Sequence, residues 1–499
     1  MEKNELMEIL SAPNPLSPAV IADLKEAANI YAGKPPWIDT KKGDKSTNLG
    51  IAVASKIARV VTTRSVVTVT SDKRIDDIYQ QYIEPVLRQQ LEKGAALGSM
   101  VMEPFYTEAK ALLDENGNIV GFEGELKVGY YYPDNVIVDE WDSPIKPRRI
   151  RLFLTKRIED FYYTLVKMQT YDETKKSVTI INRVFKNTSA PNPYTLDNLG
   201  EDMMLPEAVP VFSTIPESIT FNNVEGCLLG IYITPIANNI DIYSPAGRPY
   251  TTVAMNALER VDVTAIYTDH ETRLMRARLG IDATAWQSIE QAGSHGGNTG
   301  KELDENIRDL VMVMNPGDNK GLFEEFAPQM RERSYINIRQ VNLQQTEDAI
   351  GFNHGTLSDP QTQARTATEV LITMAETITT KEENQKALEI CIRQCCKAIQ
   401  KWLYPTQEPT DIEINFEWGT YAPAAPADQL AQDLMLYRSG ILPGYALNQT
   451  ARNLSELEAK MLVNAARLEQ GKPPLYDDDG NVISTVKELP PETVEGDLE

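Results

Sequence analysis

The chain has 499 residues, of which 42% are hydrophobic and 24% charged, a composition typical of a globular protein with about two to four domains. It has no apolar run of about 18 residues, so no transmembrane helix is expected. Met1 to Leu10 lack the basic-then-apolar order of a signal peptide, which predicts a protein made and kept in a cytoplasm. The formal net charge of −23 argues against tight nucleic-acid binding, because such binding needs a positive surface. A surface that repels DNA and lets it pass remains compatible with this charge.

Helix signals precede strand signals in the first half of the chain. Residues 18–32 predict a short amphipathic helix, and the β-branched run Val66–Thr70 predicts a strand. Residues 75–93 predict a second helix, and residues 95–105 a turn into a strand. Asn116-Gly117 is the strongest hairpin signal in the chain. We therefore expect an α+β arrangement in this half.

The middle of the chain returns to helical patterns after a strand-rich region that reaches about Phe185. Residues 186–210 are polar and rich in Asn and Pro, which predicts a surface loop. Apolar residues from Pro249 to about Arg278 fall on one helical stripe. The elements expected next are a flexible loop over 291–306, a short strand over 310–314 and a helix over 328–350.

The run from Gln361 to Tyr404 contains no Gly or Pro and predicts a long helix. Thr366 and Glu369 form a capping box at its start, because each side chain can bond the backbone amide of the other residue. Thr380 and Glu383 repeat that pattern, so two helices with a bend between them remain an alternative. A helix of this length is typical of a spine in a large assembly.

Beyond this run the chain predicts one strand and two further helices. Pro405 ends the helical pattern, and Asp411–Trp418 alternate between apolar and polar residues, which predicts a strand. Helices are expected near 427–438 and 455–470. The tail Lys487–Glu499 is acidic and contains two prolines, so it is predicted to be disordered.

The four cysteines do not follow a metal-ligand pattern. Cys391, Cys395 and Cys396 cluster in the long helical run, and Cys227 lies far away in sequence. No His or further Cys lies at ligand spacing, so buried apolar side chains are favoured over a metal or redox pair.

Two other binding patterns are incomplete. Glu302 follows Gly300-Lys301 where a phosphate loop needs Ser or Thr. The turn at Gly480 would make Leu475 the first ligand of a calcium loop, so a solvated turn is favoured. We expect no cofactor and no metal.

A group of acids is compatible with a two-metal nuclease. Its members are Asp134, Asp139, Glu140 and Asp142. They lack a supporting His, so solvated strand ends are the favoured interpretation. His270, His295 and His354 are widely separated, and no nucleophile elbow occurs. We therefore expect a protein that is not an enzyme.

An ordered set of short motifs runs through the chain. Its members are Ile30–Trp37, Ala96–Val101, Phe323–Arg331 with the pattern Glu-Phe-x-Pro-x-x-Arg, Gly351–Ser358, and Thr366–Val370 with the sequence Thr-Ala-Thr-Glu-Val. In this order the motifs resemble those of the portal proteins of tailed bacteriophages, over about residues 20–470. Residues 280–322 match the family's pattern little.

The resemblance implies a portal-like α+β architecture with a mixed α/β wing, two stem helices flanking a small clip, one long spine helix and a helical C-terminal crown. The implied segments are a wing over 1–245, a first stem helix over 246–280, a clip over 281–329, a second stem helix over 330–350, a channel loop over 351–365, a long wing helix over 366–404, a wing strand and linker over 405–424, crown helices over 425–470 and an acidic tail over 471–499.

The resemblance also implies a function without catalysis. Such a protein forms a ring, usually of twelve identical subunits, at one capsid vertex, and double-stranded DNA is packaged and ejected through it. The implied partners are the packaging terminase, capsid and scaffold proteins, and head-completion or tail adaptor proteins, with no membrane partner. The implied place is the virion, after assembly in the host cytoplasm. Twelve chains of −23 would carry roughly −280, which repels a phosphate backbone and keeps DNA mobile.

The channel loop supplies the candidate DNA-facing residues. By resemblance these are His354, Ser358, Asp359, Gln361, Gln363 and Arg365, followed by the helix start at Thr366 and Glu369. Arg365 is the one fixed positive charge between Gly351 and Thr366 in the sequence, so such a loop would touch phosphates without holding them. Three alternatives stay open: an ordinary helix–helix connection for the loop, another viral shell or tail ring component without a DNA channel, and a metal-dependent nuclease.

Overall fold

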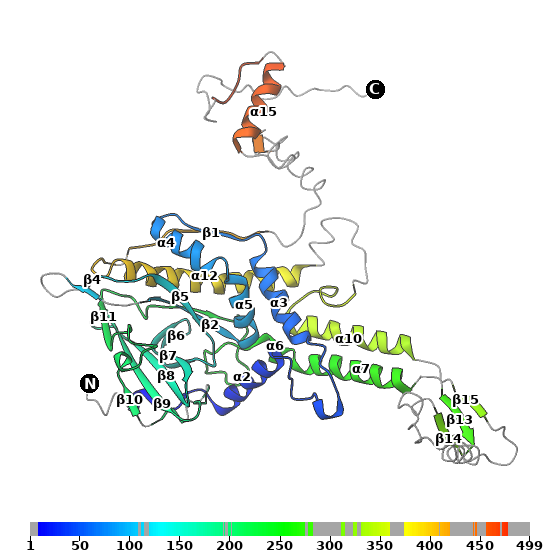
Figure 1. The fold of residues 1–499 in the computed structure, drawn as a ribbon. Helices are drawn as coiled ribbons and strands as arrows, with labels where there is room; N and C mark the ends of the chain where they lie inside the picture. The colour runs from blue at the N-terminus through cyan, green and yellow to red at the C-terminus, as the bar shows by residue number, and fades with distance from the viewer. Residues whose placement is uncertain are drawn as a thin grey trace, which may run out of the picture. The chain divides into compact units, whose positions relative to one another are not determined.

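The structure is a computed structural model, and it describes two compact units of the chain, Met1–Gln361 with Ala375–Gly419 and Thr362–Met374 with Thr420–Glu499 (Figure 1). The described residues are 8–107, 111–113, 119–192, 194, 198–200, 202–274, 278–282, 311–314, 323–326, 331–359, 374–408, 410–419, 443, 445–446, 456–469 and 472–477. Helices and several antiparallel sheets make up the first unit, which confirms the α+β class.

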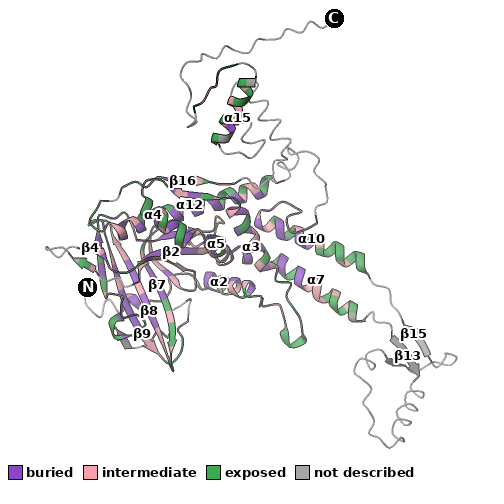
Figure 2. Cartoon of the chain, turned by 45° about the horizontal axis from the view of Figure 1, so that its top comes forward, coloured by how far each residue is buried: buried purple, intermediate pink, exposed green. Residues whose placement is uncertain are grey.

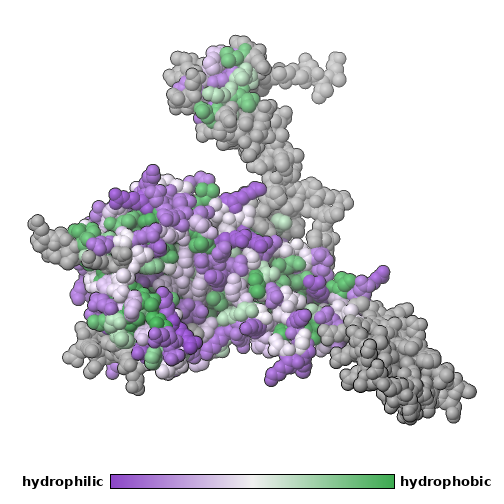
Figure 3. Space-filling model, viewed as in Figure 1, coloured by the Kyte–Doolittle hydropathy of each residue, from purple (hydrophilic) through white to green (hydrophobic). Residues whose placement is uncertain are grey.

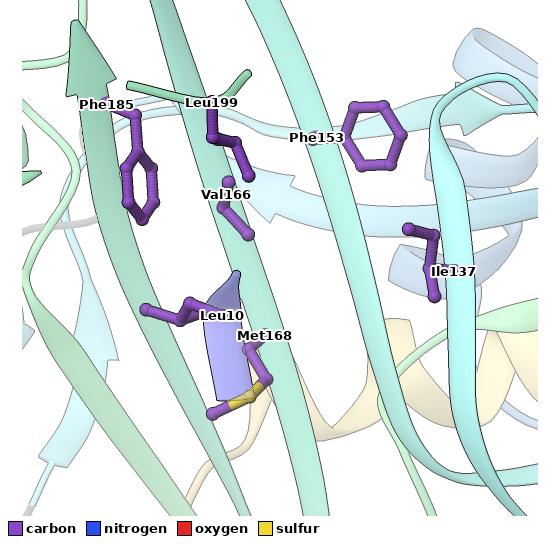
Figure 4. Packing of buried hydrophobic residues seen from close by; sticks show 7 residues of the cluster. All are labelled: Leu10, Ile137, Phe153, Val166, Met168, Phe185 and Leu199. Carbon is purple, nitrogen blue, oxygen red and sulfur yellow. The ribbon is translucent and has the colours of Figure 1, made fainter. Parts of the chain in front are cut away.

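The largest sheet has six strands and is antiparallel throughout. Its strands are β6 (Val136–Ser143), β7 (Lys146–Ile158), β8 (Phe161–Asp172), β9 (Ser177–Asn187), β10 (Asp202–Met204) and β11 (Ser218–Asn222). They pair in the order β10-β9-β8-β7-β6, and β11 also pairs with β9. One face of this sheet buries an apolar cluster (Figure 4), made of Leu10, Ile137, Phe153, Val166, Met168, Phe185 and Leu199.

Arg151 on β7 fastens the N-terminal segment to this sheet. Its side chain is fully buried, and its guanidinium donates to Asp139 Oδ1 at 2.7 Å and to the carbonyls of Leu10 and Ala12 at 2.9 and 2.8 Å. These hydrogen bonds to one carboxylate and two carbonyl oxygens offset the cost of burying the guanidinium charge. The expectation that Asp139 is a solvated strand end is therefore wrong.

A second sheet has three antiparallel strands and carries the long helix α12. The strands are β12 (Gly230–Ile233), β2 (Ser99–Tyr106) and β5 (Leu126–Tyr131), in the order β12-β2-β5. Helix α12 (Ala375–Leu403) packs on β12 so closely that a Cβ at Gly230 would collide with the carbonyl oxygen of Cys391. Only glycine permits this approach of backbone to backbone.

The N-terminal helices lie beside this second sheet (Figure 1). They are α2 (Pro18–Tyr31), α3 (Leu49–Thr62), α4 (Lys73–Ile78) and α5 (Leu87–Leu97), with a 3-10 turn at Thr40–Lys42. The short helix α6 (Tyr250–Val253) and a 3-10 turn at Pro206–Ala208 come later in the chain. The single helix predicted over 75–93 is wrong. A π-helical turn at Tyr79–Ile83 follows α4, and a turn containing Pro85 precedes α5. Proline has no amide proton and clashes with the preceding turn, so one regular helix cannot continue through it.

The helix that begins near residue 250 ends earlier than predicted. Helix α7 (Met255–Leu274) is followed by strand β13 (Arg278–Asp282), so the helix expected to reach residue 278 or 280 is wrong at its C-terminal end. β13 pairs with β14 (Val311–Met314) in parallel and with β15 (Phe323–Phe326) in antiparallel register. Backbone pairing with distant segments overrides the local helical pattern here. The strand expected over 310–314 is confirmed.

Three expectations for the second half of the chain are also settled. Helix α10 (Glu332–Ile350) matches the helix predicted over 328–350. Helix α12 runs through Thr380 without a break, so the bend allowed there is wrong. Strand β16 (Ile414–Glu417) lies within the predicted strand and pairs with β1 (Val66–Val69).

Smaller elements complete the described structure. Strands β3 (Ala111–Leu113) and β4 (Ile119–Phe122) pair in antiparallel register on either side of Asn116-Gly117, as a hairpin requires. In the second unit, helix α15 (Glu456–Glu469) confirms the helix expected near 455–470, and the helix expected near 427–438 lies outside the described residues.

Replacing Arg151 tests the buried ion pair. We expect Arg151→Met to lower the free energy of unfolding by about 3–5 kcal/mol, because Asp139 then keeps a half-buried charge without a partner. Arg149→Met is the control, because Arg149 pairs with Glu140 on the same two strands at 2.7 Å but is more exposed. It should cost about 1 kcal/mol or less. Equal losses in urea unfolding of the two variants would contradict the assignment.

Candidate functional site

Helices α7 and α10 lie side by side as an antiparallel pair (Figures 1 and 2). Asn342 Nδ2 donates to Thr264 Oγ1 at 3.1 Å and to the carbonyl oxygen of Arg260 at 3.3 Å. The Arg260 guanidinium donates to Gln345 Oε1 at 3.0 Å. Polar contacts therefore set the register of the two helices.

An ion pair joins the C-terminal end of α7 to the residue before α10. The Arg331 Nε lies 3.2 Å from Glu271 Oε1. A hydrogen bond from Tyr335, together with the Arg331 guanidinium, holds the pKa of the Glu271 carboxyl below its ordinary range. Glu271 thus stays ionised at neutral pH, and the contact persists there.

Asp262 fastens α7 to the segment that follows α2. Its side chain is buried, and its carboxylate accepts four hydrogen bonds. The donors are Trp37 Nε1 at 2.9 Å, Ser46 Oγ at 2.9 Å, Thr47 N at 2.7 Å and Thr47 Oγ1 at 2.6 Å. Four donors offset the cost of removing this carboxylate from water.

The segment 351–359 connects the end of α10 toward α12 and is held at both sides. Gly351 ends α10 in the left-handed region at φ 70°, and its carbonyl oxygen accepts from Thr380 Oγ1 at 2.7 Å. Asn353 N donates to Thr377 Oγ1 at 2.9 Å, and Thr377 N donates to Asn353 Oδ1 at 3.0 Å. Asn353 thereby satisfies an amide in the first turn of α12 that has no partner within that helix.

Glu347 holds the other end of this segment. Its side chain is fully buried on α10. Its carboxylate accepts from the backbone amides of Leu357 and Ser358 and from Ser358 Oγ, the last two at 2.8 Å. Hydrogen bonds to a buried carboxylate are stronger than neutral ones, so the described part of the segment is a folded connection.

The structure brings three of the candidate loop residues to the end of α10. Ser358 is buried and its hydroxyl faces Glu347, away from solvent. His354 is exposed, with Nε2 at 2.7 Å from Asp348 Oδ1, and Asp359 is exposed and accepts from Gln340 Nε2 at 2.6 Å. The remaining candidates lie outside the described residues: Gln361, Gln363, Arg365, Thr366 and Glu369.

Sequence reasoning missed Glu347 and Asp262. A signal was available, because each acid lies within an apolar helical stripe. Glu347 lies four residues after Leu343 and three before Ile350, and Asp262 lies four residues after Leu258. An acid on the buried face of a helix needs dedicated donors, which predicts a polar contact with another segment.

Two of the acids considered for a nuclease form ion pairs with different arginines. Asp139 pairs with Arg151 and Glu140 with Arg149, and burial raises the pKa of Asp134. Within the described ranges, no group of three or more His, Cys, Asp or Glu side chains is placed to hold a metal ion.

The interpretation of the helical cysteines as buried side chains is confirmed. Cys391, Cys395 and Cys396 are fully buried free thiols on α12. Burial raises the pKa of all three thiols, to about 12 for Cys396. Cys227 is half-buried, and burial raises the pKa of its thiol to about 12 as well.

No family model matches the chain, and no curated protein matches it. Over the part of the chain that the structure describes, no helix is both long and apolar enough to cross a membrane.

Glu347→Gln tests the hold on segment 351–359. We expect a loss of about 1–3 kcal/mol in unfolding free energy and faster hydrogen exchange at the Leu357 and Ser358 amides, because an amide group presents fewer acceptors to these donors. Glu332→Gln is the control, since Glu332 is exposed on the same helix and far from this segment in sequence. A Glu347→Gln variant whose two amides exchange at the wild-type rate would refute the role of this carboxylate.

The cysteines supply a second prediction, on reactivity. At pH 8 the thiolate fraction of Cys227 and Cys396 should be about 1,000-fold lower than in the unfolded chain, because the thiol pKa rises from 9.0 to about 12. Iodoacetamide should therefore modify both thiols slowly in the native protein and rapidly in denaturant, as read by mass spectrometry. Rapid native labelling would contradict their burial.

Proposed function

We propose that the chain is the subunit of a portal ring, a homo-oligomer at one capsid vertex that encloses a channel for double-stranded DNA. The observation that supports the proposal is the helix pair α7–α10. Its outer part, the half that contains Glu332–Val341 of α10, exposes apolar side chains on opposite flanks. The motif resemblance adds the identity of the assembly, and the charge of −23 adds the reason that DNA would not adhere.

The outer part of the pair is poorly buried. No residue of α10 from Glu332 to Val341 is buried, whereas the half that follows buries Leu343, Thr346, Glu347 and Ile350. Figure 2 shows this change from exposed to buried along α10. Figure 3 shows hydrophobic residues among hydrophilic ones on the visible surface over both helices.

The exposed apolar residues occupy two flanks. Tyr267 on α7 is 60% exposed and Ile338 on α10 is 49% exposed, and both line a groove between the helices together with Val263 and Tyr335. Ile336 is 51% exposed and lies two residues from Ile338, which places it about 200° around the helix. One flank thus carries Tyr267 and Ile338, and the opposite flank carries Ile336.

Two neighbours could cover apolar side chains on opposite flanks of the pair. A two-fold contact uses one self-complementary patch and leaves the other flank in water. A head-to-tail contact covers both flanks of every copy and closes into a ring when the rotation fits. The helix pair therefore favours a head-to-tail assembly of copies, of which the proposed closed ring is one form.

The described loop surface is consistent with a channel that does not grip DNA. The exposed carboxylates of segment 351–359 and its contacts are those of Asp348, which lies beside the imidazole of His354, and Asp359, which lies beside Gln340. Carboxylates repel phosphates, so DNA is not retained by this surface. Packaging terminase, capsid or scaffold proteins and head-completion or tail adaptors are the proposed partners of the ring, and the virion is its proposed place.

Electron microscopy tests the proposal. We expect purified protein in negative stain to form isolated rings with a central hole wide enough for duplex DNA. Tyr267→Ser combined with Ile338→Ser should raise the protein concentration needed for rings by about tenfold or more, because one flank loses its apolar contact. Leu154→Ser, at an apolar residue 42% exposed on β7, is the control. A wild-type monomer, or sheets and tubes in place of rings, would overturn the proposal, the latter in favour of another shell component.

A second experiment addresses the channel. Arg365→Gln should change DNA packaging or retention in particles while rings still assemble, because it removes the one fixed cation of the loop sequence 351–365. Packaged DNA per particle is the measurement. Wild-type packaging and retention for this variant would show that the loop is an ordinary helix–helix connection.

A further inference from the structure

The segment after β12 presents the two most exposed large apolar side chains of the described residues. Ile242 is 76% exposed and Tyr243 is 91% exposed. A neighbouring carboxylate, Asp241, completes an acidic-apolar tip, which we name the 241–243 tip. Adjacent, strongly exposed apolar side chains are typical of interaction sites.

This tip is held in one conformation by side-chain bonds. Asn238 Oδ1 accepts from the amides of Ile240 and Asp241, both at 3.1 Å, and its Nδ2 donates to the carbonyl oxygen of Ala246 at 3.1 Å. Asp241 Oδ1 accepts from the amide of Tyr243 at 3.2 Å. An ordered loop loses little conformational entropy when it docks, so binding through the exposed side chains of this tip costs little free energy in ordering the loop.

The same unit carries an apolar cavity on a different set of elements. The cavity has a volume of about 320 Å³ and lies between α12, the turn at Ile145–Pro147 and the segment 223–229. Leu228, Leu229 and Ile390 are among its lining residues. Cavities of this size and lining accept apolar groups from a ligand or partner.

A buried cation also lines this cavity. Lys401 on α12 is 5% exposed, and its Nζ donates to the carbonyl oxygen of Gln407 at 2.9 Å. No carboxylate of the described residues forms an ion pair with it, and burial lowers its pKa. A buried ammonium without a counter-ion is unfavourable, so the cavity favours an occupant that combines apolar groups with a carboxylate.

We propose that the 241–243 tip of one copy docks into this cavity of the neighbouring copy, with Ile242 and Tyr243 against its apolar lining and Asp241 toward Lys401. The inference rests on the proposed ring and names one of its subunit contacts. Tip and cavity are different surfaces of one chain, so each copy offers one of each, and the contact is head-to-tail as ring closure requires. The charge of Asp241 also complements the cavity lining, in which Lys146, Arg393, Lys397 and Lys401 outnumber the acids Glu225 and Glu408.

Photochemical cross-linking tests the contact on assembled rings of the full chain. We expect p-benzoylphenylalanine in place of Tyr243 to give, after irradiation, a ladder of covalent multimers whose links map to residues 145–147, 223–229 or 390–408. The same probe in place of Val211, which is 42% exposed, should not label these residues. Links that join Tyr243 to the cavity within one copy, or to other segments of the neighbour, would overturn the inference.

Truncation of the tip supplies a second measurement. Ile242→Ala combined with Tyr243→Ala should weaken ring assembly by about 30-fold or more, as expected for loss of a central apolar anchor. Leu205→Ala combined with Val211→Ala is the control, because both are exposed apolar residues, at 40% and 42%, outside the tip and the cavity lining. Circular dichroism melting checks that both double variants fold.

The outcomes separate the two proposals. A wild-type chain that forms no ring overturns both. Rings that survive the truncated tip at wild-type concentrations, or that cross-link elsewhere, overturn the tip contact and leave the portal proposal standing.

Discussion

The packing of α12 on strand β12 is the contact on which the rest of the first unit depends. Gly230 allows the two backbones to touch, and Asn384 then joins three elements. Its Oδ1 accepts from Tyr232 Oη at 2.6 Å, and its Nδ2 donates to Tyr250 Oη and to the carbonyl oxygen of Thr380, both at 2.7 Å. A fully buried amide whose oxygen and nitrogen are both hydrogen-bonded specifies one arrangement of strand and helices.

Helix α12 also fixes the position of the α7–α10 helix pair. Thr377 and Thr380 bind Asn353 and Gly351 in the segment after α10, and Glu347 binds the far end of the same segment. Exposed apolar side chains on α7 and α10 are therefore carried by helices whose inner ends are firmly attached to the unit. In the proposed ring, such attachment would couple the subunit contacts on the flanks to the segment 351–359.

Local signals predicted many of the elements. Apolar spacing placed α2 and α10, and alternation placed β16, because these patterns follow from 3.6-residue and two-residue periodicity. The interruption between α4 and α5 was predictable from Pro85 and was overlooked. The early end of α7 was not predictable from neighbours in the sequence, since β13 gains its strand form by pairing with β14 and β15.

The sequence by itself determined the α+β class, the negative charge and the positions of several helices and strands, because periodicity, proline and net charge can be read from the chain without its fold. Tertiary structure decided which polar groups are buried and what they bind. The Ser358 hydroxyl donates to buried Glu347, and Asp139 was expected in water and instead binds Arg151. The partners of buried Asp262 lie more than two hundred residues away, and such a pairing is specified only when the folded chain brings both segments together.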